Sequence, residues 1–248
     1  MRTLALSHRR GLGHGVLLLV VAACWSLGAV PAQAQLVWDL ANPGNNPANG
    51  YTITQITSNN GLRVGDKLFD NFAVIPQTAT GVPDPSNIFI KGFVSGIDIG
   101  LEFNGLWIYS GSGANVTQNI SWDVTADNPF QIIGAEFDLT GFSVTGSGFV
   151  NIVEDIDRVL PQPTLDIANL LVGSTSTFDS ADWSTNPGGA TKIHVVKDII
   201  VGRTSSELAG TAQLTQFRQT FVQVPEPGTL VLAAAGLALM AGRRRKAC

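Results

Sequence analysis

The sequence of 248 residues has a formal net charge of −4 and two cysteines, Cys24 and Cys248. Between residues 36 and 224 it is more acidic, with 18 Asp and Glu against 8 Lys and Arg, a formal charge of −10. Such a charge argues against a nucleic-acid or anionic-membrane partner, and the lack of cysteine in this region excludes disulfides and thiol chemistry. At about 190 residues, the region is long enough to bury one substantial core.

Residues 1–34 are expected to form a secretory signal peptide that contains the N-terminal signal helix. A basic start precedes an apolar core at residues 16–23, and Ala32 and Ala34 form an A-x-A cleavage site. The mature chain would then begin at Gln35.

Two other export signals stay open as alternatives. The sequence Val21-Ala22-Ala23-Cys24 is similar to a lipoprotein signal, in which Cys24 would carry a lipid after cleavage. The pair Arg9-Arg10 is compatible with twin-arginine export, although no Ser or Thr directly precedes it and no Phe follows. The A-x-A site favours ordinary secretion.

Between the two ends, apolar residues alternate with polar ones, which is typical of half-buried strands. No comparable helical period is present before the C-terminal tail. We expect strands at Leu36–Leu40, Tyr51–Ile56, Lys67–Ile75, Asn87–Phe93, Ile97–Phe103, Val116–Thr125, Gln131–Leu139, Phe149–Val153, Lys192–Val201 and Gln213–Val224. Many short strands separated by turn residues predict an all-β fold, an antiparallel β-sandwich of jelly-roll or Ig-like type over residues 35–224.

Two polar stretches interrupt this rhythm and are expected to be loops, Ala41–Gly50 and Gly173–Ala190. The second is unusually long for a connection within a compact domain. It is therefore a candidate for a working loop.

The C-terminal residues 225–248 have three parts. Pro225 and Pro227 impose extended geometry around Glu226. An uncharged run from Leu230 to Ala241 follows, which at about 1.5 Å per residue spans only about 18 Å of a bilayer core of roughly 30 Å. It predicts a short transmembrane-like helix that anchors the chain only transiently in the inner membrane.

The basic cluster Arg243, Arg244, Arg245 and Lys246 is expected to stay on the cytoplasmic side and stop transfer. This arrangement resembles the PEP-CTERM sorting signal, with Pro225, Glu226 and Pro227 as its motif. The resemblance implies recognition by an exosortase, removal of the tail, and delivery to the cell surface or extracellular matrix. An ordinary membrane anchor with a stop-transfer cluster is the alternative.

The body of the chain also resembles a recurrent β-rich domain of PEP-CTERM proteins. The similar phrases are GDKLFDNFAV at 65–74, GLEFNGLW at 100–107, TGFSVTGSG at 140–148 and HVVKDIIV at 194–201. The resemblance supports the predicted fold and implies no settled activity.

The residues offer little for catalysis, and we expect neither an enzyme nor a cofactor. His194 is the sole histidine after the signal peptide, and no G-x-S-x-G motif is present. Because residues 36 to 224 contain one histidine and no cysteine, a zinc or copper site built from nitrogen and sulfur ligands is excluded. A matrix glycosidase stays open as an alternative, because Glu102, Glu136 and Asp138 could supply a pair of carboxyl groups.

No metal is expected, but one acidic cluster suits calcium. Glu154, Asp155 and Asp157 place three carboxylates within four residues, although the spacing of an EF-hand loop is missing. A solvated acidic turn is the favoured interpretation of this cluster.

Aromatic residues near predicted loops suggest a carbohydrate-binding alternative. Trp107, Tyr109 and Trp183 are candidates to stack on sugar rings, whereas Trp122 is in phase with apolar neighbours and is expected to be buried. Whether Trp38 is buried in the core or contacts a ligand stays undecided. We therefore expect an exported protein of the cell surface or extracellular matrix with a structural or adhesive role. A lectin-like module that binds the exopolysaccharide is the first alternative.

Overall fold

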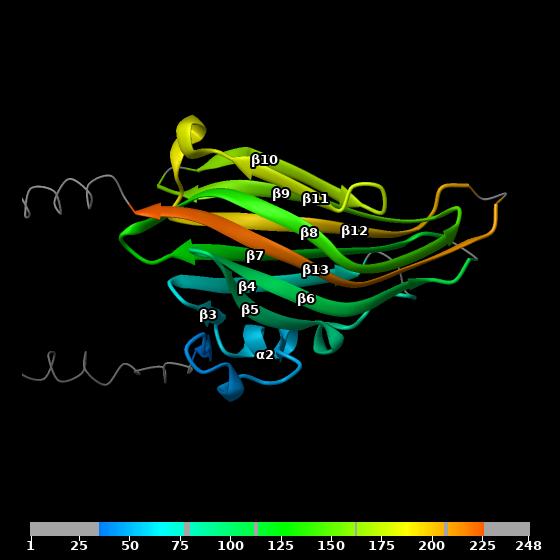
Figure 1. The fold of residues 1–248 in the computed structure, drawn as a ribbon, viewed down its shortest axis with the longest axis horizontal. Helices are drawn as coiled ribbons and strands as arrows, with labels where there is room; N and C mark the ends of the chain where they lie inside the picture. The colour runs from blue at the N-terminus through cyan, green and yellow to red at the C-terminus, as the bar shows by residue number, and fades with distance from the viewer. Residues whose placement is uncertain (1–34, 77–79, 112–113, 162, 206–207, 226–248) are drawn as a thin grey trace, which may run out of the picture. The chain divides into compact units, whose positions relative to one another are not determined.

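The computed structural model describes residues 35–76, 80–111, 114–161, 163–205 and 208–225, and these form a β-sandwich (Figure 1). The predicted all-β, antiparallel fold is confirmed, with β1 and β3 as a parallel pair among the antiparallel ones. The predicted signal helix and C-terminal helix lie outside the described residues. Within those residues, no helix combines the length and the apolar character needed to cross a bilayer.

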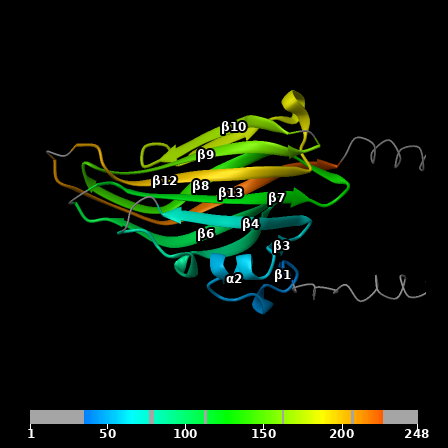
Figure 2. The same ribbon diagram turned by 180° about the vertical axis from the view of Figure 1, so that it is seen from behind.

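One sheet has seven strands in the order β1-β3-β4-β7-β12-β9-β10. Their bounds are Leu36–Trp38, Leu62–Val64, Lys67–Pro76, Val116–Ala126, Lys192–Arg203, Gly148–Leu160 and Thr164–Gly173. Figure 2 shows β4, β7, β12, β9 and β10 of this sheet beside one another.

The other sheet has six strands in the order β11-β8-β13-β6-β5-β2. Their bounds are Phe178–Asp182, Phe130–Gly146, Gly210–Pro225, Asp98–Tyr109, Phe89–Ser95 and Tyr51–Thr52. The last strand of the chain, β13, therefore lies inside this sheet, hydrogen-bonded to β8 on one side and to β6 on the other.

The predicted strand Tyr51–Ile56 is wrong, because the chain turns into the helix α2 (Ile53–Ser58) after two strand residues. The hydroxyl of Thr52 accepts a hydrogen bond from the Gln55 backbone N–H, and the Gln55 side chain accepts one from the Thr52 N–H. This reciprocal capping box starts the helix, and Ile53 and Ile56, three residues apart, turn into the core.

The predicted loop Gly173–Ala190 contains the edge strand β11 and a single helical turn, η3 (Ser184–Gly188). Residues 178 to 182 pair with residues 138 to 134 of β8. The other predicted loop, Ala41–Gly50, contains only the short 3-10 turn η1 (Pro43–Asn45). A second 3-10 turn, η2 (Pro85–Asn87), precedes β5.

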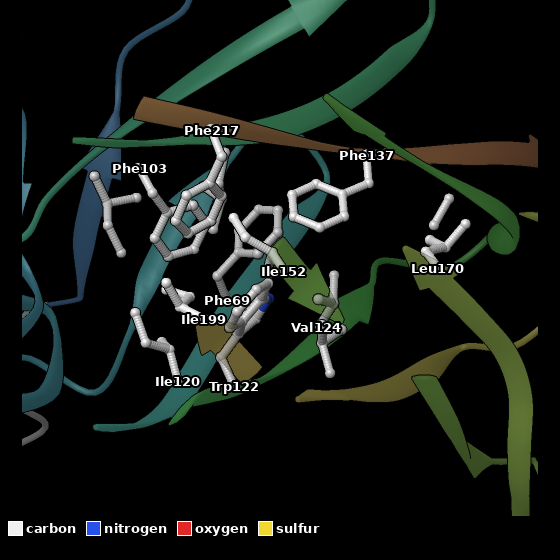
Figure 3. Close-up of a cluster of buried hydrophobic side chains, with 14 of the residues drawn as sticks. Phe69, Phe103, Ile120, Trp122, Val124, Phe137, Ile152, Leu170, Ile199 and Phe217 are labelled. Carbon is white, nitrogen blue, oxygen red and sulfur yellow. The ribbon is translucent and has the colours of Figure 1, made fainter. Parts of the chain in front are cut away.

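The core lies between the two sheets and is rich in aromatic side chains (Figure 3). Trp122 is completely buried, as predicted, and stacks on Phe72 with a ring separation of 5.9 Å. Phe103 of β6 and Phe217 of β13 stack with their ring centroids 4.7 Å apart. Each such side chain contributes about 1.5 to 3 kcal/mol through burial. Phe103 of β6 also lies 5.0 Å from Trp122 of β7, so aromatic packing joins the two sheets.

Candidate functional site

The three aromatic residues predicted to contact a glycan are buried, so that prediction is wrong. Trp107, Tyr109 and Trp183 are 0%, 2% and 1% exposed. The Trp107 indole N–H donates to the Gln118 side chain at 2.6 Å, and the Trp183 indole N–H donates to the Ile132 carbonyl at 3.0 Å. Burial with satisfied indole donors is the behaviour of core tryptophans.

The acidic cluster Glu154, Asp155 and Asp157 does not converge on one point, so neither the calcium site nor the solvated turn is correct. All three residues lie on strand β9, where successive side chains point to opposite faces. Glu154 is fully buried inside the sandwich, while Asp155 and Asp157 lie on the outer face. The described residues contain no group of three or more metal-ligating side chains in reach of one ion.

Glu102 is an ion-pair partner. Its carboxylate accepts hydrogen bonds from the Arg218 guanidinium at 2.6 and 2.8 Å and from Asn104 at 3.1 Å. Burial alone would raise the pKa of Glu102, but these hydrogen bonds and the charge of Arg218 outweigh it and hold that pKa below its ordinary value. An ionised Glu102 cannot act as the general acid of a glycosidase.

Glu136 and Asp138 lie on strand β8, on the same outer face of the six-stranded sheet as Glu102. Arg218 stands opposite Asp138 on one side and Glu102 on the other. A cation between two carboxylates suits a surface charge network rather than an acid and base pair.

His194 has a structural position on strand β12. It lies opposite Asp123 of β7, and its Nδ1 is 2.6 Å from the Asp123 carboxylate. The same carboxylate pairs with Lys192 at 2.8 Å and accepts a hydrogen bond from Asn71. The cluster therefore ties three strands together across the sheet face.

The most suitable binding site is a hollow beside Trp38, with a volume of about 440 Å³. We call it the Trp38 hollow; its lining residues are Val37, Trp38, Asp39, Leu40, Ala41, Asn45, Asn46, Arg63 and Gly65. Volumes of roughly 300 to 1,000 Å³ are usual for ligand pockets, which combine apolar walls with a few polar groups. The Trp38 hollow has this composition.

Trp38 differs from the three other described tryptophans because it is only half-buried. Strand β1 runs parallel to β3, which sets Trp38 beside Val64 at the edge of the seven-stranded sheet (Figure 2). Its ring meets Tyr51 edge-on at 6.2 Å and 78°. The indole is thus held in a fixed orientation while part of it stays accessible.

The polar side of the Trp38 hollow is a loop organised around Asp39. The Asp39 carboxylate accepts hydrogen bonds from the backbone N–H groups of Ala41 and Asn42 and from the Asn45 amide at 3.0 Å. The Asn46 side chain bonds both backbone groups of Asp39. The backbone N–H of Asn42, followed by the Asn45 amide, holds the pKa of Asp39 below its ordinary value.

Arg63 completes the lining from strand β3. Its guanidinium is 2.5 Å from the Asp127 carboxylate and also donates to the Gln35 side chain at 3.3 Å. The hollow therefore presents an indole face, amide groups, a carboxylate and a guanidinium in a rigid arrangement. Sequence reasoning missed it because residues 37 to 46 meet Arg63 and Gly65 only through the parallel pairing of β1 with β3.

The C-terminal end of the sandwich leads into the predicted sorting signal. Strand β13 ends at Pro225, which lies opposite Phe130 of β8. The family model of the PEP-CTERM protein-sorting motif matches residues 223–246 of the chain. The chain carries a PEP-CTERM protein-sorting motif. This motif indicates an exported protein that an exosortase processes at the cell envelope.

The PEP-CTERM motif begins within the folded domain, because Gln223 is buried and hydrogen-bonded to Ile97 and Asp98. Glu226, Pro227, the basic residues 243–246 and the signal cleavage residues Ala32 and Ala34 lie outside the described residues. Their roles stay predictions.

No curated protein sequence matches the chain. Among solved structures, the carbohydrate-binding module TmCBM61 in complex with beta-1,4-galactotriose is similar at 8% identity, with 63% of this chain and 89% of that one covered and a TM-score of 0.30. The mannan-recognising module TmCBM27 covers 63% of this chain and 98% of its own at 9% identity and a TM-score of 0.24. Accessory secretory proteins 1, 2 and 3 of Streptococcus pneumoniae give 12% identity, 56% and 93% coverage and a TM-score of 0.29.

Proposed function

We propose that this exported protein is delivered to the cell surface or extracellular matrix, where it binds a polysaccharide without catalysis and so has an adhesive role. The single observation that carries the proposal is the Trp38 hollow. The half-buried Trp38 indole lines the hollow and is oriented by its edge-on contact with Tyr51, and an indole can stack on a sugar ring. The polar loop beside it provides hydrogen-bonding groups for hydroxyls.

The arrangement of the loop supports this proposal. Asp39, Asn45 and Asn46 hold one another in place through hydrogen bonds, so little conformational freedom is lost when a ligand binds. The Asp39 carboxylate already accepts four hydrogen bonds within the loop. The side-chain oxygens of Asn45 and Asn46 keep further lone pairs that can accept hydrogen bonds from sugar hydroxyls. Arg63 adds guanidinium donors to the lining of the hollow.

The charge of the domain narrows the ligand class. A formal charge of −10 between residues 36 and 224 repels anionic polymers. The charge thus argues against an anionic polysaccharide, and the ligand that we propose is a neutral one. Because stacking and neutral hydrogen bonds carry the recognition, we expect its affinity to change little between low and physiological salt.

The experiment is calorimetric titration of the full chain with a panel of neutral polysaccharides. Trp38→Ala should weaken binding about tenfold, corresponding to about 1.4 kcal/mol. Phe178→Ala is the matched control, because Phe178 is an aromatic residue that is 53% exposed on strand β11, outside the hollow. Asn45→Ala, which removes an exposed side chain of the lining, should weaken binding without removing an aromatic from the fold.

Two results would count against the proposal. One is the absence of binding to every neutral polysaccharide in the panel. The other is binding that survives both Trp38→Ala and Asn45→Ala undiminished, whatever the effect of Phe178→Ala.

A further inference from the structure

A lysine, a carboxyl group and a primary amide meet in the centre of the sandwich. Lys197 of β12 and Glu154 of β9 are both completely buried and form an ion pair. The Lys197 Nζ also donates a hydrogen bond to the Gln219 side-chain oxygen at 2.7 Å. Gln219 lies on β13, so the contact joins the seven-stranded sheet to the six-stranded one.

Aromatic rings enclose this group. The Lys197 Nζ lies 3.2 Å from the ring centroid of Phe137 and 5.7 Å from those of Trp122 and Phe217. Figure 3 shows these three rings gathered between the sheets. Water is thus kept away from the amine, and a charge there is poorly solvated.

Burial makes the neutral forms of both ionisable groups more accessible, and a proton passed from Lys197 to Glu154 within the ion pair produces them. Burial lowers the pKa of Lys197 to about 8, against the opposing attraction of Glu154. Burial likewise raises the pKa of Glu154. A neutral amine is a nucleophile, and a protonated carboxyl can donate its proton.

Two atoms of the group have no hydrogen-bond partner although they are buried, the Glu154 Oε1 and the Gln219 Nε2. Such orphaned polar atoms are rare in folded proteins and destabilise them. A reaction that expels Nε2 and gives Glu154 a new partner would remove both defects.

We propose that Lys197 and Gln219 join in an intramolecular amide bond, with Glu154 as the catalytic acid and base. The Lys197 nitrogen attacks the Gln219 carboxamide carbon while Glu154 donates a proton to the amide oxygen and accepts one from the nitrogen. The carbon–Nε2 bond then breaks as Glu154 passes the proton from Lys197 to Nε2, which leaves as ammonia. The hydroxyl proton on the former amide oxygen returns to Glu154, and the carbonyl re-forms. Glu154 ends protonated as it began, and no oxidant or reductant takes part.

Proximity makes this slow reaction feasible. Strand pairing holds the amine beside the carboxyl, and the packing of the two sheets places the Gln219 side-chain oxygen 2.7 Å from the amine. This arrangement removes the entropic cost of bringing the groups together. The aromatic enclosure keeps water from competing for the same carbonyl carbon. The product would be a covalent bridge between the two sheets.

A second pair of the same residue types provides an internal comparison. Lys67 of β4 is buried and hydrogen-bonded to Gln223, also on β13, and lies 3.3 Å from Asp66. Here, however, the Gln223 Nε2 donates to the Ile97 carbonyl at 3.1 Å, and the Asp66 side chain is 18% exposed. This pair lacks an unpartnered leaving group and a fully enclosed carboxyl, so the proposal is confined to Lys197 and Gln219.

The test is mass spectrometry of the purified full chain, with fragmentation of its proteolytic peptides. We expect a branched peptide that joins the Lys197 segment of β12 to the Gln219 segment of β13, lighter than its two parts by one ammonia. The branched peptide is decisive, because a mature N-terminal Gln35 can also lose ammonia by cyclisation. Lys67→Met should keep the branch, whereas the near-isosteric Glu154→Gln should lose it.

Unlinked Lys197 and Gln219 peptides from the native protein would overturn the proposal without recourse to any variant. A branch that joins Lys197 to Glu154 with loss of water, or Lys67 to Gln223, would overturn it as well. A branch that persists in Glu154→Gln would remove Glu154 from the mechanism.

Discussion

The guanidinium of Arg218 lies 2.6 Å from the carboxylate of Glu102, across the β13–β6 pair on the outer face of the six-stranded sheet. The Glu102 side chain is 11% exposed and that of Arg218 is 46% exposed. Because Glu102 is more enclosed than its partner, removal of Arg218 leaves a carboxylate that water solvates only in part. The pair therefore links stability to pH.

The folded-state pKa of Glu102 lies below its ordinary value, so the pair stabilises the fold above the unfolded-state pKa. That contribution disappears as the pH falls through the folded-state pKa. Arg218→Ala should therefore reduce the free energy of unfolding by about 1 kcal/mol at pH 7, and by progressively less as the pH falls from 7 through the folded-state pKa. Urea unfolding across this pH range measures the difference, and an equal loss at both ends would contradict the assignment.

Phe217 connects the aromatic core, since it stacks on Phe103 and meets Phe137 edge-on at 5.9 Å. Phe217→Ala should reduce the free energy of unfolding by about 3 to 5 kcal/mol, because it removes a fully buried ring and leaves a cavity. Phe178→Ala, on the surface, should change it by less than about 0.5 kcal/mol. Chemical denaturation of both variants gives the comparison, and similar losses would show that Phe217 is not central to packing.

Gly92 on strand β5 allows the close approach of Trp38. A Cβ at this position would lie 2.7 Å from the Val64 side chain and 2.9 Å from the Trp38 ring. Gly92→Ala should thus destabilise the fold by about 1 to 3 kcal/mol through overpacking and move the indole. We expect weaker polysaccharide binding together with a changed tryptophan fluorescence spectrum. An unchanged spectrum with normal stability would mean that the Trp38 ring is packed more loosely than described.

The sorting motif predicts a defined C-terminus. The protein recovered from envelope and medium should lack residues 243–248 when the exosortase is present and retain them when it is absent. Glu226→Ala should likewise leave the tail in place, while Phe178→Ala should not affect processing. Mass spectrometry of the C-terminal peptide decides the matter, and retention of the tail in both genetic backgrounds would refute processing.

The sequence predicts strands well where one face is buried and the other exposed. On β7, every second residue from Val116 to Ala126 is buried, and Trp122 follows that phase. Each predicted strand segment but Tyr51–Ile56 is a strand, and there a local capping box overrides the alternation. By contrast, β10 escaped prediction because its pairing with β9 shifts between Thr164 and Ala168, which breaks the period.

The candidate site was much less predictable. Trp107 is flanked by Leu106 and Ile108, which are 48% and 41% exposed, so both faces of this strand are apolar and alternation cannot identify the inner one. Trp183 is buried, and its indole N–H donates a hydrogen bond to the carbonyl of Ile132, which is 51 residues away in the sequence. The partner of Glu154, Lys197, is 43 residues distant. Such long-range contacts leave no trace in local patterns.

The position of β13 has a mechanical consequence. A protein attached to a surface through its C-terminal end would be pulled along a strand that is hydrogen-bonded on both sides, to β8 and to β6. Force would then load two ladders in shear, many bonds at once, instead of peeling one strand from an edge bond by bond. The central position of β13 is thus suited to resisting a force applied at the C-terminal end of the domain.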